Sequence, residues 1–166
     1  AEIVLNKENL HATRAYIADF TPDYEAGVRL HYKPDEFNTF SAMVLNGWQV
    51  IKETNTTKAF ALSWSLNKPG KIAGNWNLMF ADEQPLSAVK PLFRHYQNIY
   101  FRVWLGEKWL ILPVLDVMAE RKAQSDLPGW NSIIAPAFSA RYAISDRFGV
   151  AGRYEYIYDP KSLIPE

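Results

Sequence analysis

The chain of 166 residues contains no cysteine, carries no net charge and has no long hydrophobic run. Without cysteine it has no disulfides, thiolate nucleophiles or cysteine-based zinc sites, which fits an envelope protein that avoids oxidative pairing. Its 18 basic and 18 acidic residues cancel, so no global field attracts nucleic acid, and we expect no nucleic-acid partner. The longest apolar run, 109–115, contains Pro113 and is shorter than the roughly 18–20 residues of a membrane-spanning helix.

Motifs of enzymes and metal sites are also missing. The three histidines, His11, His31 and His95, are scattered and show no metal-ligand spacing. There is neither a G-x-S-x-G serine motif nor a phosphate-binding loop, so we expect no enzymatic activity, no cofactor and no bound metal. One catalytic arrangement stays open, because barrel enzymes of the outer membrane carry Ser, His and acidic residues at a rim. Asp116, Glu120 and His95 could be brought together in that way.

Alternation of apolar and polar residues with a period of two is the main pattern that is present. Between 148 and 157, Phe, Val, Gly and Tyr occupy the even positions, whereas Arg153 and Glu155 are odd. That period predicts strands with one apolar and one polar face. We expect strands at 24–33, 37–46, 58–67, 72–80, 92–105, 108–121, 131–145 and 148–157. Pro113 denies the ladder a hydrogen-bond donor, which predicts a bulge there.

The connections between these strands alternate in length. Short turns at 34–36, 68–70, 106–107 and 146–147 alternate with longer loops at about 47–56, 82–91 and 122–130. Outer-membrane barrels have short periplasmic turns and longer outward loops in this order. The predicted fold class is therefore all-β, an antiparallel up-and-down transmembrane β-barrel with about eight strands from this chain. A soluble lipocalin-like barrel is the alternative, and it requires apolar residues inside and charges outside.

The expected domain is single and covers residues 1–166. Residues 1–23 form a loop or an incomplete strand, with a short helical or strand piece near 12–20. Residues 24–157 supply the barrel strands, and 158–166 form a loop or a truncated end. No secretion signal precedes Ala1, so we expect that it was removed or that the chain is a piece of a longer protein.

Several stretches together are similar to a known family. They are Tyr24-Glu25-Ala26-Gly27-Val28-Arg29-Leu30, Ala42 to Trp48 ending in Asn-Gly-Trp, the polar loop 53–57, and Arg153 to Tyr156 followed by Asp159-Pro160. Over residues 12 to 160 the chain resembles the second putative β-barrel porin family of Gram-negative outer membranes. The resemblance implies a barrel in that membrane and brings no catalytic residue. Family members are longer and have a C-terminal strand that is missing here, so we expect this chain to be part of a larger barrel.

Charged residues on the polar sides of the strands are the candidate site. The residues expected to line a pore are Arg29, Arg102, Asp116, Glu120, Arg141, Arg153 and Glu155, with Glu25 on the same side. Fixed charges in a constriction select solutes by field and by hydrogen bonding. The alternative is a packed lumen in which arginines and carboxylates neutralise each other, because a complete eight-stranded barrel is only wide enough for side chains.

Aromatic residues make up 14% of the chain and include six tryptophans. Most of these fall near predicted strand ends or turns, where amphipathic rings sit at a membrane–water boundary. Those expected at the membrane interface are Trp48, Trp64, Trp76, Trp104 and Trp109. Trp130 belongs to the same set, and sugar stacking is the alternative role.

The sequence thus predicts a porin-like passive channel for small hydrophilic solutes in the outer membrane. Its expected partners are the lipid bilayer and the solutes, together with envelope proteins or further copies of the chain. A non-conducting structural barrel in a larger envelope assembly is the alternative function.

Overall fold

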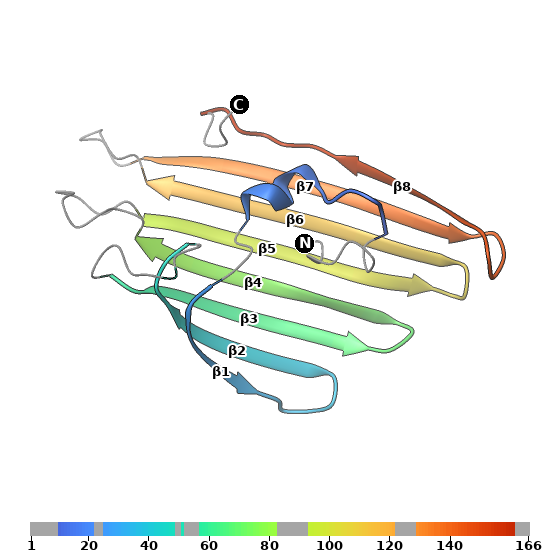
Figure 1. The fold of residues 1–166 in the computed structure, drawn as a ribbon, viewed down its shortest axis with the longest axis horizontal. Coiled ribbons are helices and arrows are strands. Elements are labelled where there is room, and N and C mark those ends of the chain that lie inside the picture. The colour runs from blue at the N-terminus through green and yellow to red at the C-terminus, as the bar shows by residue number, and fades with distance from the viewer. Residues whose placement is uncertain are drawn as a thin grey trace.

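Eight antiparallel strands form one sheet in a computed structural model, which describes residues 10–21, 25–48, 51, 57–82, 93–121 and 129–161. The strands are β1 (Gly27–Tyr32), β2 (Asn38–Leu45), β3 (Ala59–Lys68), β4 (Ile72–Asp82), β5 (Phe93–Leu105), β6 (Trp109–Arg121), β7 (Trp130–Ala143) and β8 (Gly149–Glu155). Each strand pairs with the next one in the chain, so the sheet is a continuous meander (Figure 1). All eight strands confirm predicted segments, and the all-β antiparallel class is correct.

Tight turns join alternate pairs of strands at one end of the sheet (Figure 1). Gly70 and Gly106 have φ of 68° and 63°, a backbone conformation that glycine adopts without strain, and both lie in these turns. In the first turn Asp35 accepts hydrogen bonds from the backbone nitrogens of Phe37 and Asn38 at 2.8 and 2.7 Å. Together with the Asn38 side chain, these bonds hold the pKa of Asp35 below its ordinary value. The predicted longer loops lie largely outside the described residues.

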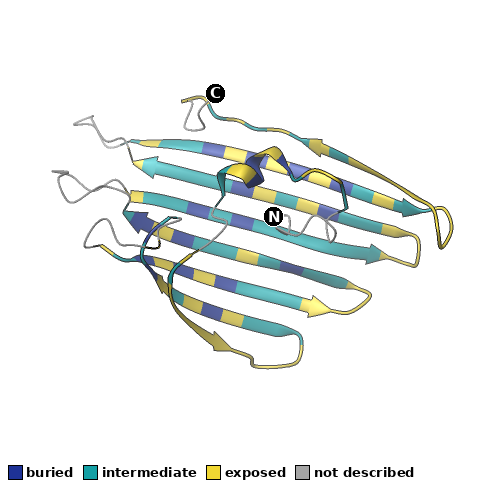
Figure 2. Cartoon of the chain, in the orientation of Figure 1, coloured by how far each residue is buried: buried dark blue, intermediate teal, exposed yellow. Residues whose placement is uncertain are grey.

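The two faces of the sheet differ in character. Buried and exposed residues alternate along β3 and β7, which gives the striped pattern of Figure 2. We call the inner face the one that carries Ser41, Ser63, Asn98 and Asp116, all of which are buried. The opposite, outer face carries exposed large hydrophobic residues on every strand, including Leu30, Phe60, Phe80, Phe93, Leu115, Phe138 and Tyr154.

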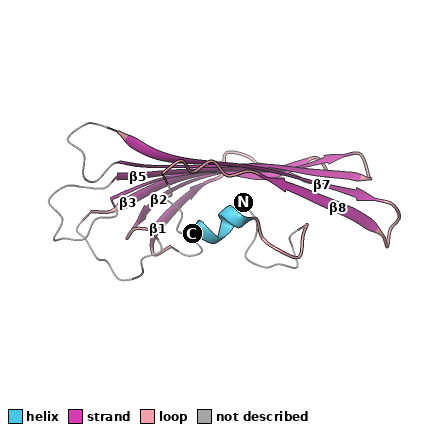
Figure 3. Cartoon of the chain, turned by 90° about the horizontal axis from the view of Figure 1, so that it is seen from above, coloured by secondary structure: helices cyan, strands magenta, loops and turns pink. Residues whose placement is uncertain are grey.

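A short segment, residues 10–21, lies on the inner face. It contains the 3-10 helix η2 (Tyr16–Phe20), which agrees with the short piece expected near 12–20. Both flanks of the sheet bend toward the side on which η2 lies (Figure 3). Ile17 and Ala18 of the segment are buried in one cluster with Ile133 and Ala135 of β7. The concave side of the sheet is therefore partly filled by its own chain.

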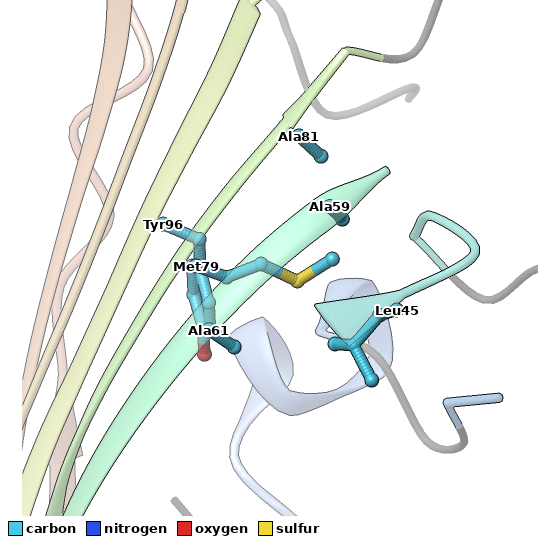
Figure 4. Packing of buried hydrophobic residues seen from close by; sticks show 6 residues of the cluster. All are labelled: Leu45, Ala59, Ala61, Met79, Ala81 and Tyr96. Atoms are coloured by element: carbon cyan, nitrogen blue, oxygen red, sulfur yellow. The ribbon is translucent and has the colours of Figure 1, made fainter. Parts of the chain in front are cut away.

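A second apolar cluster lies on the inner face of β2 to β5. It contains Leu45, Ala59, Ala61, Met79, Ala81 and Tyr96 (Figure 4). The three alanines leave space beside the larger Met79 and Tyr96 side chains. Met118 packs against this cluster and also against the cluster under η2, so the two clusters are continuous across the inner face.

The strands are staggered by a regular amount. Successive register partners form one row across the middle of the sheet, here called the central row: Phe40, Trp64, Trp76, Ile99, Leu115 and Pro136. The midpoints of the four tight turns, Glu36, Gly70, Glu107 and Asp146, lie 4, 6, 8 and 10 residues away from that row. The turn end thus advances by one residue per strand. With a rise of about 3.4 Å per residue and strands about 4.8 Å apart, this stagger corresponds to a tilt of about 35°. That is the strand tilt of a β-barrel.

The predicted bulge at Pro113 is wrong. Tyr100 pairs with Val114 on one side of the proline and Val103 with Ile111 on the other, so the β5–β6 register is unchanged across it. The β5–β6 ladder skips residues 101 and 102, where the missing proline N–H interrupts it. Pro113 remains paired with Phe138 of β7. The proline therefore removes hydrogen bonds without inserting an extra residue.

Within the part of the chain that the structure describes, β1 and β8 do not pair with each other, and the sheet is open. Pairing of β7 continues irregularly past β8 to a bridge between Ile134 and Tyr158. No helix among the described residues is long and apolar enough to cross a membrane.

Candidate functional site on the inner face

A row of polar side chains crosses six strands on the inner face. It consists of successive register partners: His31, Ser41, Ser63, Asn77, Asn98 and Asp116. Ser63 donates a hydrogen bond to Asn77 at 2.7 Å, Asn77 to Asn98 at 3.3 Å, and Asn98 to Asp116 at 2.8 Å. Period-two alternation directs every second residue of a strand to the inner face. The register of the strands then places one such polar residue from each of six strands side by side.

Asp116, one of the predicted pore-lining residues, is the acidic end of this row. Only 3% of its surface is exposed. One carboxylate oxygen accepts hydrogen bonds from the Tyr96 hydroxyl at 2.6 Å and from Asn98. The carboxylate is therefore satisfied by buried neighbours, and Asp116 lines a small cavity together with residues of the 10–21 segment, including Ala18 and Thr21.

Glu120 lies nearer the longer connections and pairs with Arg94. The Arg94 guanidinium donates to the Glu120 carboxylate at 3.2 Å across the β5–β6 pair. The same guanidinium lies 5.2 Å from the Trp48 ring centre, and Trp48 meets Tyr96 edge-on at 5.2 Å. Arg94 is an inner-face arginine that the sequence interpretation did not include. Its period-two relation to Tyr96 could have revealed it.

Arg153 and Glu155 of β8 hold the 10–21 segment to the inner face. Arg153 donates to the carbonyl oxygens of Thr13 and Arg14 at 2.7 and 2.8 Å and forms an ion pair with Glu155. Glu155 also accepts a hydrogen bond from the backbone nitrogen of Tyr16 at 2.7 Å. These two residues, expected to line a pore, therefore act on the chain's own segment as anchors.

The remaining predicted pore-lining residues are also on the inner face. Arg29 donates to Ser41 at 3.2 Å, which places it beside the polar row. Arg102 is half-buried and Arg141 is exposed. Their strand positions put both on the tight-turn side of the central row. The structure thus brings the seven residues to one face but spreads them over its height, so they do not form one narrow ring.

The large apolar residues of the outer face form a band across the strands, here called the apolar belt. On each strand we located the outer-face large apolar residue that lies farthest toward the tight turns. On β1 this residue is Tyr32, which is level with the central row. The corresponding residues are 2, 6 and 8 residues beyond the central row on the later strands: Leu66 on β3, Leu105 on β5 and Ile144 after β7. On β5 the polar Gln97 and His95 take outer positions on the opposite side of the row. The belt is therefore oblique to the strands with the same sense as the stagger, which is how a membrane crosses a tilted barrel.

The tryptophans occupy both faces. Trp109 and Trp130 are exposed on the outer face at strand ends, and Trp109 contacts Tyr142 with ring centres 4.8 Å apart. Trp48 contacts the inner-face residues Tyr96 and Arg94. Trp104 lies two residues after the inner-face Arg102 in β5 and therefore shares its face. Neither of these two belongs to an outer girdle, because Trp48, which follows β2, contacts inner-face side chains and Trp104 occupies an inner-facing position of β5.

Trp64 and Trp76 pair directly with each other in the middle of β3 and β4, not at strand ends as expected. Both indole N–H groups have side-chain acceptors: Trp64 donates to Asn38 at 2.9 Å and Trp76 to Gln97 at 3.2 Å. In hydrocarbon no water can take such a hydrogen bond, so an internal acceptor is required. This pairing accounts for two of the few polar residues on the outer face.

The candidate catalytic group does not assemble. His95 is stacked on Phe80 of the outer face at 4.6 Å, whereas Asp116 and Glu120 point to the inner face. No group of three or more His, Cys, Asp or Glu residues in the described ranges could hold a metal ion. The sidedness is also the reverse of a lipocalin-like barrel, because charges line the concave side and apolar residues cover the convex one.

Comparison with known proteins identifies a family. The family model described as "Putative beta-barrel porin-2, OmpL-like" matches residues 1–165. None of the curated proteins and none of the solved structures matches the chain. The family match covers almost the entire chain and agrees with the meander and with its two-faced strands.

Proposed function

The chain belongs to the putative beta-barrel porin-2, OmpL-like family, and on that premise we propose that it forms a passive channel for small hydrophilic solutes in the bacterial outer membrane. The lipid bilayer contacts the outer face, and solutes pass along the inner one. In this proposal the chain performs no chemistry and needs no cofactor. The inner wall acts through size, charge and hydrogen bonding.

One observation carries the proposal: the same strands present an oblique apolar belt outside and hydrogen-bonded polar and charged residues inside. In a bilayer an apolar surface is required wherever strands meet lipid, whereas a polar interior is needed only where water or polar groups are enclosed. The one-residue stagger per strand supports the barrel arrangement that such a channel requires.

Single-channel recording in a planar bilayer tests this function directly. The full-length protein, refolded in detergent, should give steady ohmic steps. Small polyethylene glycols that enter the pore should lower the conductance, while large ones should leave it unchanged. A heat-modifiable, membrane-inserted barrel that never conducts would reject the channel.

A second function is favoured by the segment at 10–21, which rests on the inner face and is anchored by Arg153 and Glu155. If it fills the lumen, the barrel is a non-conducting structural unit that assembles with envelope proteins or with further copies of the chain. The double variant Arg153→Met, Glu155→Met removes both anchors while conserving approximate side-chain size. A higher conductance of the double variant than of the unmodified protein would identify the segment as a plug. Equal conductance of the two proteins would exclude the plug.

A further inference from the structure

The inner face is charged asymmetrically along the barrel axis. Starting three residues from the central row, toward the tight turns, β4 to β8 present Lys71, Arg102, Lys108, Arg141 and Arg153. Lys71 and Lys108 belong to this face because their carbonyls extend the ladders by accepting from Trp104 and Ala143 at 2.9 and 2.8 Å. We call these five residues the basic wall.

No acidic residue shares the inner-face positions of the basic wall in the described strands. The inner-face carboxylates of Asp116 and Glu155 lie within one residue of the central row, and Glu120 lies five residues away on the opposite side. Glu107 and Asp146 are exposed at the midpoints of turns, past the strand ends. The potential along the inner wall therefore becomes positive toward the tight-turn mouth.

Arg141 is the most available member of this wall. It is exposed and makes no hydrogen bond or ion pair with the described residues, whereas Arg153 is engaged with Thr13 and Glu155. A cavity of about 170 Å³ lies beside it, lined by Leu10, Arg141, Gly149, Val150 and Ala151. A Cβ on Gly149 would stand 3.4 Å from the Arg141 Nε, so the glycine leaves the guanidinium free on that side.

The size and chemistry of this place suit a small anion. Since a water molecule occupies about 30 Å³, the cavity has room for a phosphate or carboxylate group with a few waters. A guanidinium matches either group with two parallel hydrogen bonds. We propose that the basic wall makes the tight-turn mouth an anion-selecting vestibule in which Arg141 contacts the carboxylate or phosphate of the solute. This inference rests on the proposed channel and specifies its substrate class.

Ion selectivity tests the vestibule when the channel conducts. In a KCl gradient the reversal potential of the full-length protein should indicate preference for chloride. The Arg141→Glu variant should lower the chloride-to-potassium permeability ratio by at least about twofold, because it reverses the charge beside the cavity. Lys68→Gln is the matched control: Lys68 occupies an outer-face strand position at the tight-turn end of β3, with its ammonium 5.5 Å from the Phe37 ring centre, and its loss should leave the ratio unchanged.

A binding measurement separates failure of the vestibule from failure of the channel. Inorganic phosphate titrated calorimetrically into the detergent-refolded protein should bind, and Arg141→Gln should weaken the binding by roughly tenfold, while Lys68→Gln should not. Binding that depends on Arg141 without any conductance would retain the anion site and reject the channel. Ohmic steps with cation preference, or with a permeability ratio unaffected by Arg141→Glu, would overturn the vestibule and leave the channel standing.

Discussion

The two faces of this sheet come from the same strands but handle polar groups in opposite ways. On the inner face, polar side chains bond to one another across strands, as Asn98 does with Asp116. On the outer face two of the few polar side chains, Asn38 and Gln97, accept hydrogen bonds from tryptophan N–H groups. The difference indicates that the inner face can use water and charge, whereas the two outer-face indole N–H groups are satisfied by neighbouring side chains, as hydrocarbon demands.

The largest effect is expected when an arginine is placed on each face in turn, at adjacent positions of one strand. Phe101 lies on the outer face of β5, within the apolar belt, and its ring centre is 6.0 Å from that of Trp64. Phe101→Arg should lower the free energy of unfolding in a bilayer by about 2–4 kcal/mol, because the charge meets hydrocarbon. Reversible urea unfolding in lipid vesicles measures it. Tyr100→Arg, one residue away on the inner face, should cost clearly less, and equal costs would contradict the assigned sidedness.

The next effect belongs to the buried polar row. Asp116→Ala leaves the Tyr96 hydroxyl and the Asn98 amide without their acceptor, so we expect a loss of about 1–3 kcal/mol in unfolding free energy. Asp116→Asn keeps an oxygen at the same place and should cost less. The same vesicle unfolding assay compares the two variants. An alanine variant as stable as the asparagine one would mean that the row contributes no stability.

Much of the fold could be predicted because it depends on period two and on turn residues. All eight strands and the four tight turns follow from local patterns, such as Gly70 and Gly106 at the turns. The bulge at Pro113 was wrong because sequence shows a missing donor but not whether the neighbouring strand keeps its register. Whether a strand end meets a membrane boundary depends on the stagger of all strands, so Trp64 and Trp76 were misplaced.

The site was only partly predictable for a related reason. The alternation of residues along each strand is enough to assign Arg29, Asp116 and Arg153 to one face, and the structure agrees. It does not reveal that the segment before β1 folds back across 139 residues of sequence, so that Glu155 binds the Tyr16 backbone. The cavity that Asp116 shares with residues of that segment is likewise formed by a long-range approach.

A moderate effect should follow from removing the anchor of the 10–21 segment. Glu155→Ala deletes the acceptor of the Tyr16 N–H, and we expect local opening to become easier by about 1 kcal/mol, because the contact is charge-assisted but exposed. Hydrogen exchange at the Tyr16 amide should then be roughly fivefold faster. Glu120→Ala is the control, since it breaks the ion pair with Arg94 on the same face without touching the segment. If both variants change Tyr16 exchange equally, the anchoring role is excluded.

The smallest effect concerns the hydrogen bond between Trp76 and Gln97 on the outer face. Either single change, Trp76→Phe or Gln97→Leu, also alters apolar contact with lipid, so only a double-mutant cycle isolates the bond. The expected coupling is about 0.6 kcal/mol, the average for side-chain hydrogen bonds inside membranes. Vesicle unfolding of the four proteins provides it. The same cycle on Trp64 and Asn38 is the matched comparison, because its 2.9 Å bond has the same chemistry near the tight-turn side of the sheet. Zero coupling in both pairs would mean that these indoles reach water, and the belt would then have to be moved away from β3 and β4.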